Sequence, residues 1–175
     1  LPIGGVLATD NAVIPYGVGV DIGCRMSLSI FDLPASHFKG KEHQLEAILK
    51  DNTKFGMYET HASRVDHEVF YKSEFKDIPL LKNLLPKAYK QLGTSGGGNH
   101  FVEFGIAKID NPENEWKLDK GEYFAVLSHS GSRGLGANIA KHYTYLATKQ
   151  CPLPKNVQHL AWLDLNTHDG QEYWL

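Results

Sequence analysis

Three glycine-rich segments contain the side chains best suited to chemistry. The first reads Gly-Val-Gly-Val-Asp-Ile-Gly-Cys over residues 17–24 and places the carboxylate of Asp21 three residues before the thiol of Cys24. Glycine adopts backbone conformations that other residues avoid, so both side chains could converge on one point. A thiolate beside a carboxylate needs a cation, and a divalent metal ion would supply it. The alternative is a buried cysteine that packs as a small apolar residue, with an aspartate that caps a turn.

The second segment reads Gly-Thr-Ser-Gly-Gly-Gly and leads into Asn99 and His100. Backbone N–H groups of such a run can surround an anion, but no lysine follows the glycines as a Walker phosphate loop requires. His100 could bind a metal ion and Asn99 could donate to a phosphate. If a strand follows, Glu103 shares a face with Phe101, and Val102 points to the other face. The alternative is a flexible loop that enters a strand and carries a surface histidine.

The third segment reads Leu-Ser-His-Ser-Gly-Ser-Arg-Gly-Leu-Gly over residues 127–136 and is typical of a strand that turns into a helix. The N-terminus of a helix offers N–H groups and a partial positive charge, which suit a phosphate. Arg133 adds a bidentate donor for the same kind of ligand. His129 falls at the end of the strand, where binding and catalytic groups are often displayed.

Together the three segments supply oxygen, sulfur and nitrogen donors for one metal site, from Asp21, Cys24, His100 and His129. This mixed donor set suits manganese, zinc, iron or cobalt. Loops that suit phosphate flank these residues, and the combination favours phosphoryl-transfer chemistry.

The elements that must position these side chains follow from hydrophobic periodicity and from turn residues. Residues 52–79 are polar with scattered aromatic residues and predict an irregular loop or small insertion. We expect an α+β fold with mixed sheets and surrounding helices, as part of a larger single catalytic domain. The predicted strands are 5–8, 26–31, 101–107 and 122–127, the last two joined by a turn at 110–114. The predicted helices are 41–51, 80–92 (broken or kinked at Pro86), 135–149 (with Leu135, Ile139, Tyr143 and Leu146 on one face) and a last one beginning near residue 169.

Composition limits the function classes. The 175 residues carry a formal net charge of −2, so nucleic-acid binding through bulk positive charge is not supported. No apolar run approaches the roughly 18 residues of a membrane span. The two cysteines are too few for a disulfide scaffold and fit a reducing, cytoplasmic setting. We interpret residues 1–175 as a fragment of one catalytic domain, truncated at both ends.

The three motifs, at 17–24, 96–103 and 129–136, closely resemble the RtcB family of RNA-splicing ligases, in its N-terminal to central part. The opening Leu-Pro-Ile-Gly-Gly-Val-Leu-Ala is similar to that family as well, whereas residues 52–79 match only loosely. The resemblance implies a ligase that depends on GTP and manganese and acts in tRNA splicing or RNA repair. Such an enzyme joins an RNA 3′-phosphate or 2′,3′-cyclic phosphate to a 5′-hydroxyl end, through a guanylylated histidine and an activated RNA end.

The resemblance also implies residue roles. Asp21, Cys24 and His100 would hold one Mn²⁺ ion. A second ion would bind His129 and Cys24, which bridges the two. Arg133 would bind a phosphate and, with Asn99, act in catalysis. The GTP site would be lined by Asn99, His100, Phe101, Val102 and Glu103.

Two features depart from the family pattern. Arg25 follows the motif cysteine, where the family usually has glycine. The histidine that becomes guanylylated belongs to the family's C-terminal half, and we interpret His142, His159 and His168 as surface or structural residues. This chain alone is therefore expected to be inactive as a ligase. The residues themselves leave two alternatives to the ligase function open. One is a metal-dependent phosphoesterase, and the other is a non-catalytic module that binds a nucleotide or RNA.

Overall fold

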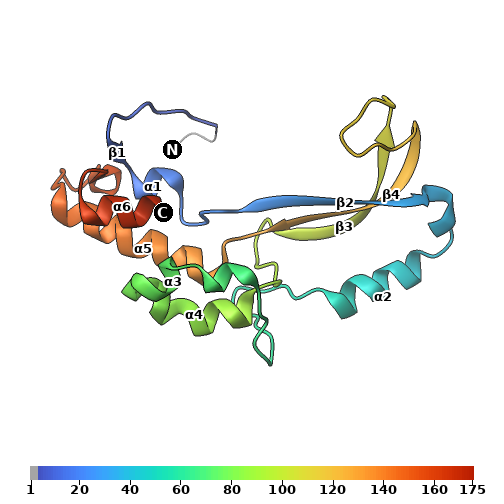
Figure 1. Cartoon of the computed structure of the whole chain (residues 1–175), viewed down its shortest axis with the longest axis horizontal. Helices are drawn as coiled ribbons and strands as arrows, with labels where there is room; N and C mark the ends of the chain where they lie inside the picture. The colour runs from blue at the N-terminus through green and yellow to red at the C-terminus, as the bar shows by residue number, and fades with distance from the viewer. Residues whose placement is uncertain (1–3) are drawn as a thin grey trace. The chain divides into compact units, whose positions relative to one another are not determined.

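The computed structural model describes residues 4–175, which fall into two compact units (Figure 1). The sheet unit comprises Cys24–Thr60 and Gly93–Gly131. The helical unit comprises residues 4–23 with His61–Leu92 and Ser132–Leu175. The first three residues of the family-like opening motif lie outside the described residues. Each unit is built from segments far apart in the sequence, so neither could be identified as a continuous domain.

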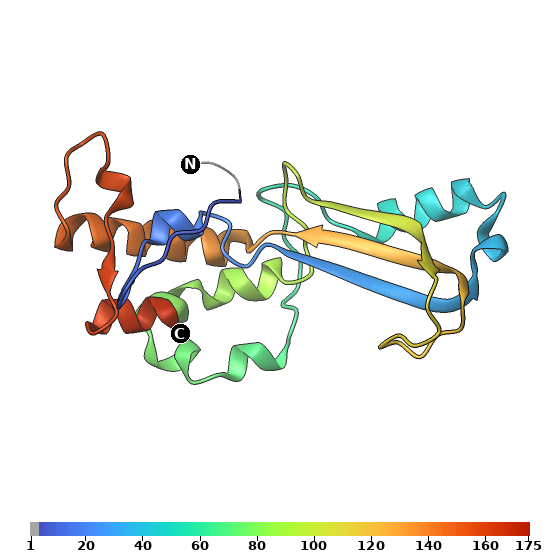
Figure 2. The same ribbon diagram turned by 90° about the horizontal axis from the view of Figure 1, so that it is seen from above.

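The sheet unit is built on three antiparallel strands in the order β2-β4-β3 (Figure 2). Because β4 is central and antiparallel to both neighbours, its end lies between the starts of β2 and β3. Phe124 of β4 is buried and stacks on Phe38 with ring centroids 3.7 Å apart, which packs the chain after β2 onto the sheet. The elements of this unit are β2 (Arg25–Pro34), the 3-10 helix η1 (Ala35–Phe38), α2 (Glu42–Asn52), β3 (Phe101–Ile109) and β4 (Gly121–Ser130).

The helical unit is organised around α5, which contacts α1, α4, α6 and β5. Its main core contains Val13, Tyr143, Ala147, Ala161 and Leu163, and a second cluster contains Phe70, Phe75 and Ala88. The helices are α1 (Pro15–Val18), α3 (Glu74–Asp77), α4 (Pro79–Gln91), α5 (Arg133–Gln150) and α6 (His168–Trp174), with 3-10 helices η2 (Glu68–Tyr71) and η3 (Gln158–Leu160). A two-stranded antiparallel sheet pairs β1 (Ala12–Val13) with β5 (Leu163–Asp164).

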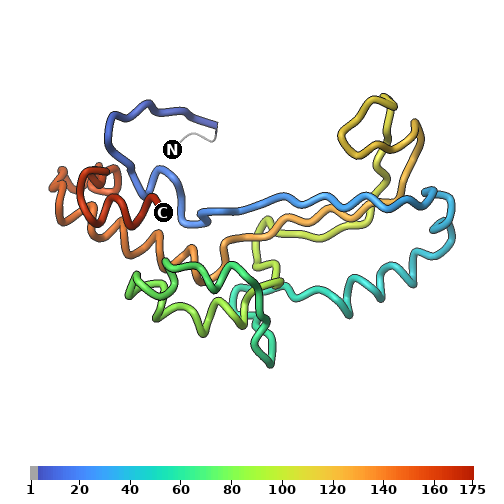
Figure 3. Tube along the Cα trace, in the orientation of Figure 1, coloured from blue at the N-terminus to red at the C-terminus, as the bar shows by residue number. Residues whose placement is uncertain are grey.

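Most predicted elements are confirmed, and the fold class is α+β as expected. The three strands of the sheet unit and the helices α2, α4, α5 and α6 all begin within a few residues of their predicted positions. The chain between β3 and β4 leaves the sheet as a loop (Figure 3), in which the Asn114 side chain accepts hydrogen bonds from the N–H groups of Trp116 and Leu118. Both named sheets are antiparallel rather than mixed.

One predicted element is absent, and two others differ in detail from what the sequence indicates. Residues 5–8 form no strand, since Val6 is 98% exposed and this segment pairs with no strand among the described residues. Helix α4 continues through Pro86 without a break. Proline costs a helix one hydrogen bond and adds a steric clash, and packing of the flanking turns against the second core cluster offsets this cost. Residues 52–79 are largely irregular, as predicted, but they contribute Phe70 and Phe75 to that cluster.

The predicted face of α5 packs against the two core clusters, but most of its fully buried positions lie one residue further along the chain. Tyr143 is buried as expected, but the other buried positions are small residues, namely Gly136, Ala140 and Ala147. Ile139 and Leu146 are only partly buried and pack against the margin of the main core. Small side chains let neighbouring elements approach the helix closely, and hydrophobic periodicity alone gives them little weight.

Candidate metal centre

Three of the four predicted metal ligands meet at one end of the sheet unit. Cys24 directly precedes β2 and His100 directly precedes β3, while His129 is the penultimate residue of β4. The register pairs His129 with Met26 on one side and with Phe101 on the other. The strand order therefore brings together side chains that are 76 and 105 residues apart in the sequence.

The donor atoms of this cluster are close enough to share an ion. Cys24 Sγ lies 2.7 Å from His129 Nε2 and 3.8 Å from His100 Nε2. One ligand atom from each of the three residues lies within 4.8 Å of the other two, and all three residues are partly buried. Metal–sulfur and metal–nitrogen bonds of about 2.3 and 2.1 Å place such donors about 3.5 Å apart around a tetrahedral ion. The observed separations of 2.7 and 3.8 Å lie on either side of this value, so a shift of less than about 1 Å in the Cys24–His129 separation would let the thiol and the two imidazoles hold one transition-metal ion.

The orientation of His129 is fixed by the backbone. Its Nδ1 lies 3.1 Å from the carbonyl oxygen of Asn99. A carbonyl can only accept, so Nδ1 carries the proton and Nε2 presents its lone pair to Cys24. A hydrogen bond of this kind on the far nitrogen is characteristic of metal-binding histidines, because it fixes both the tautomer and the ring. The Phe101 ring packs against His129 at a centroid distance of 5.7 Å and gives the site an apolar wall.

Glycines with positive φ stand just before the ligands. Gly23 has φ +82° and precedes Cys24, and Gly98 has φ +72° and precedes Asn99 and His100. A Cβ at either glycine would meet no described atom within 4 Å, so the requirement for glycine comes from the backbone conformation rather than from space.

The glycine-rich loop before His100 is anchored on both sides within the sheet unit. The N–H of Ser95 donates to the carbonyl of Lys54, and the N–H of Gly56 donates to the carbonyl of Gly96. On the other side, the N–H of Gly131 donates to the carbonyl of Ser95. Residues 54–56 were missed by sequence reasoning, because backbone pairing through an irregular segment leaves no pattern of residue types.

Asp21 belongs to the helical unit, where its carboxylate binds the start of α5. Its Oδ1 accepts hydrogen bonds from the backbone N–H of Ser132 at 2.6 Å and from the Ser132 hydroxyl at 2.8 Å. A carboxylate at a helix N-terminus is favoured by the helix dipole. The structure therefore shows Asp21 as a cap of the start of α5, a different role from the cap of its own turn considered above, and its role as a metal ligand stays a prediction. Ser132 lies in the third glycine-rich segment, but nothing in the sequence links it to Asp21, 111 residues away.

Arg133 begins α5 in a strained conformation, with φ +54°. Partial burial lowers the pKa of its guanidinium, and the Asp21 carboxylate opposes that shift. The N–H of Gly134 donates to the side-chain oxygen of Gln91 at 2.9 Å, so this N–H of the helix start already has a protein partner. An anion at this helix would therefore depend on Arg133 and on the remaining N–H groups.

The predicted nucleotide-binding residues follow the loop into β3. Asn99 and Glu103 are exposed, whereas His100, Phe101 and Val102 are partly buried. The register with β4 runs without interruption from Phe101 to Ile109, so Phe101 and Glu103 share a face and Val102 points to the other. Their binding of GTP stays a prediction.

No helix between residues 4 and 175 has the length and apolar character needed to cross a lipid bilayer.

Comparison with known proteins gives one consistent family. The family model described as tRNA-splicing ligase RtcB matches residues 1–175. The RNA-splicing ligase RtcB of Escherichia coli strain K12 is 31% identical, over 98% of this chain and 42% of that protein. The tRNA-splicing ligase RtcB of Thermococcus kodakarensis is 27% identical, over 99% of this chain and 44% of that protein. The chain thus spans less than half the length of these relatives.

Proposed function

Because the chain belongs to the RtcB family of tRNA-splicing ligases, we propose that it forms part of an enzyme that joins RNA ends with GTP and manganese. The RNA partners carry a 3′-phosphate or 2′,3′-cyclic phosphate on one end and a 5′-hydroxyl on the other. The reaction passes through a guanylylated histidine and an activated RNA end, in tRNA splicing or RNA repair in the cytoplasm. The observation that carries this proposal is the convergence of Cys24, His100 and His129 at one end of the sheet unit.

The donor set fits the proposed metal. Cys24 offers sulfur, and the two histidines offer imidazole nitrogens, of which that of His129 is oriented by the Asn99 carbonyl. Asp21 would complete the set with an oxygen ligand, as the motif match implies. Bound manganese would neutralise negative charge on phosphate groups during their transfer.

The remaining roles fall to residues of the loops and of β3. Arg133 would hold a phosphate through its planar guanidinium, and Asn99 would donate to a phosphate from its exposed side chain. The positive φ of Gly98 supports a role for the loop in close backbone approach to a nucleotide. The GTP site would be formed by Asn99, His100, Phe101, Val102 and Glu103.

The test uses the protein that contains this chain, with radiolabelled GTP, Mn²⁺ and an RNA pair that carries the required ends. We expect a guanylylated protein and a joined RNA product. The 175-residue chain alone should bind metal and form no guanylylated product, since the nucleophilic histidine is predicted elsewhere. Phosphate release without any requirement for GTP would identify a phosphoesterase instead. RNA or nucleotide binding without either reaction would identify a binding module.

A further inference from the structure

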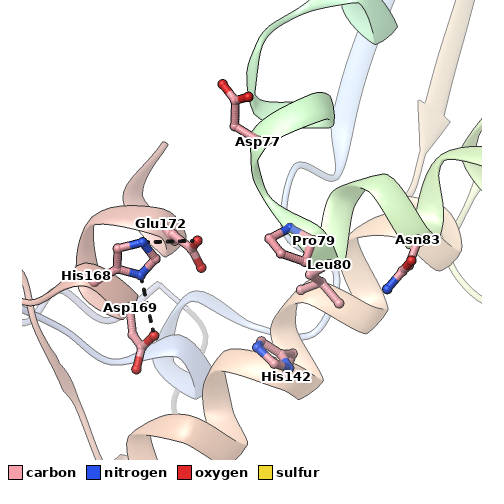
Figure 4. Close-up of a pocket in the computed structure, with 8 residues that line it drawn as sticks. All are labelled: Asp77, Pro79, Leu80, Asn83, His142, His168, Asp169 and Glu172. Atoms are coloured by element: carbon pink, nitrogen blue, oxygen red, sulfur yellow. Dashed lines mark ion pairs between the residues drawn. The ribbon is translucent and has the colours of Figure 1, made fainter.

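A cleft of about 580 Å³ opens within the helical unit, between side chains of α3, α4, α5 and α6 (Figure 4). Its polar lining consists of three carboxylates, two imidazoles and one amide, from Asp77, Asp169, Glu172, His142, His168 and Asn83. Among the described residues that line it, none is lysine or arginine. The cleft therefore has an excess of negative charge and favours a cation.

Three of these side chains form a compact set of donors. The imidazole of His168 lies between two carboxylates, with Nδ1 3.9 Å from Asp169 Oδ1 and Nε2 3.6 Å from Glu172 Oε1 (Figure 4). One ligand atom from each residue lies within 4.8 Å of the other two. The Asp169 and Glu172 carboxylates therefore have oxygen atoms within 4.8 Å of each other and repel. A divalent ion between them would remove this repulsion.

Helix α5 orients both carboxylates toward His168. The Tyr143 hydroxyl donates to Glu172 Oε2 at 3.0 Å, which leaves Oε1 directed at the imidazole. In the same way, Gln150 donates to Asp169 Oδ2, and Oδ1 is directed at the imidazole. Burial raises the pKa of Tyr143 and keeps its hydroxyl protonated as a donor. Neutral donors that hold the outer oxygen of a carboxylate are the usual support of metal ligands.

The chemistry and accessibility of the set indicate the kind of ion. A ligand set that combines imidazole with carboxylates suits zinc, cobalt, nickel or manganese better than magnesium or calcium, which prefer oxygen ligands alone. The His168 side chain is 82% exposed, so an ion and its water ligands can reach the site.

We propose that His168, Asp169 and Glu172 form a second binding site for a divalent transition-metal ion, within the helical unit. His142, Asp77 and Asn83 line the same cleft as this set. This revises the interpretation of His142 and His168 as merely surface or structural residues. The proposal is independent of the proposed ligase function.

The experiment measures metal binding to the 175-residue chain with Cys24 replaced by alanine, so that the other centre is weakened. Zn²⁺ binding is followed by isothermal titration calorimetry, and Co²⁺ binding by visible absorption. We expect one ion per chain and a cobalt spectrum without a sulfur charge-transfer band. His168→Gln and Glu172→Gln should each weaken binding at least tenfold, because each removes one of three ligands. His43→Gln, at an exposed position on α2, is the matched control and should leave affinity unchanged.

Thermal unfolding of each variant separates binding from folding. Glu172→Gln can still accept the hydrogen bond from Tyr143, so its melting temperature should stay close to that of the parent. A variant that loses metal binding but keeps its melting temperature supports the site. The proposal is overturned if the Cys24→Ala chain binds no ion, or if His168→Gln binds as tightly as its parent. A change in melting temperature without any change in metal affinity would show that the carboxylates only stabilise the start of α6, and would also overturn it.

Discussion

Replacement of Cys24 by alanine tests the candidate metal centre most directly. The Cys24 sulfur lies 2.7 Å from His129 Nε2 and 3.8 Å from His100 Nε2, so it is the donor shared by both histidine contacts. Without it, two neutral imidazoles remain from the cluster, and the anionic thiolate that would balance the ion's charge is lost.

The size of the effect follows from the ligand count. Loss of a residue that merely supports a metal ligand costs about 10- to 100-fold in affinity. Loss of one of three clustered ligands should reach at least the upper end of that range. We therefore expect Cys24→Ala to weaken metal binding at the centre formed with His100 and His129 by at least about 100-fold, equivalent to about 2.7 kcal/mol. The fold should be kept, because Cys24 is only partly buried and belongs to neither core cluster.

The assay is a Co²⁺ titration followed through the charge-transfer band of a thiolate-bound ion, which a site without sulfur does not produce. The matched control is Cys151→Ala. Cys151 packs against the main core of the helical unit, so its loss should cost about 1 kcal/mol of stability and leave the band unchanged. A band of equal intensity and affinity in Cys24→Ala, or equal losses in both variants, would refute the assignment of Cys24 as a metal ligand.

Three further predictions concern the backbone and the helical core. Gly98→Ala should lower the free energy of unfolding by about 1–2 kcal/mol and weaken metal binding, because φ is +72° at this position. The control is Gly105→Ala, which should be nearly neutral because Gly105 lacks a positive φ. Chemical unfolding measures the stability of both variants. Gly170→Ala should destabilise the protein by about 3 kcal/mol or more, because its Cβ would overlap the carbonyl oxygen of Asp164, and a preserved melting temperature would contradict this. Burial raises the pKa of Tyr143 above its ordinary value near 10, so the stability that its neutral form provides is complete below pH 10 and is lost as the pH rises further. The Tyr143→Phe variant should be less stable than the parent protein at neutral pH, because it lacks the hydrogen bond to Glu172. Its free energy of unfolding, measured by urea titration, should fall less between pH 10 and 11 than that of the parent.

The sequence by itself determined the local features of this protein. Alternating and helical periodicities located the three strands of the sheet unit and the main helices, because burial of one face imposes a repeat of two or about 3.6 residues. Residue types alone identified Cys24, His100 and His129 as a candidate ligand set. The family resemblance came from the same motifs.

Only the tertiary structure decided how these parts meet. The register of β4 between β2 and β3 places His129 beside Cys24, across 105 residues of sequence. The carbonyl of Asn99, which orients His129, is present at every residue and therefore leaves no sequence signal. His168 and Glu172 are an i,i+4 pair on α6, so the sequence did contain the set that they form with Asp169. Only the structure shows that Tyr143 and Gln150 of α5 hold its two carboxylates. Local patterns follow from the chain's own geometry, whereas these contacts depend on how distant segments pack, which no spacing along the chain records.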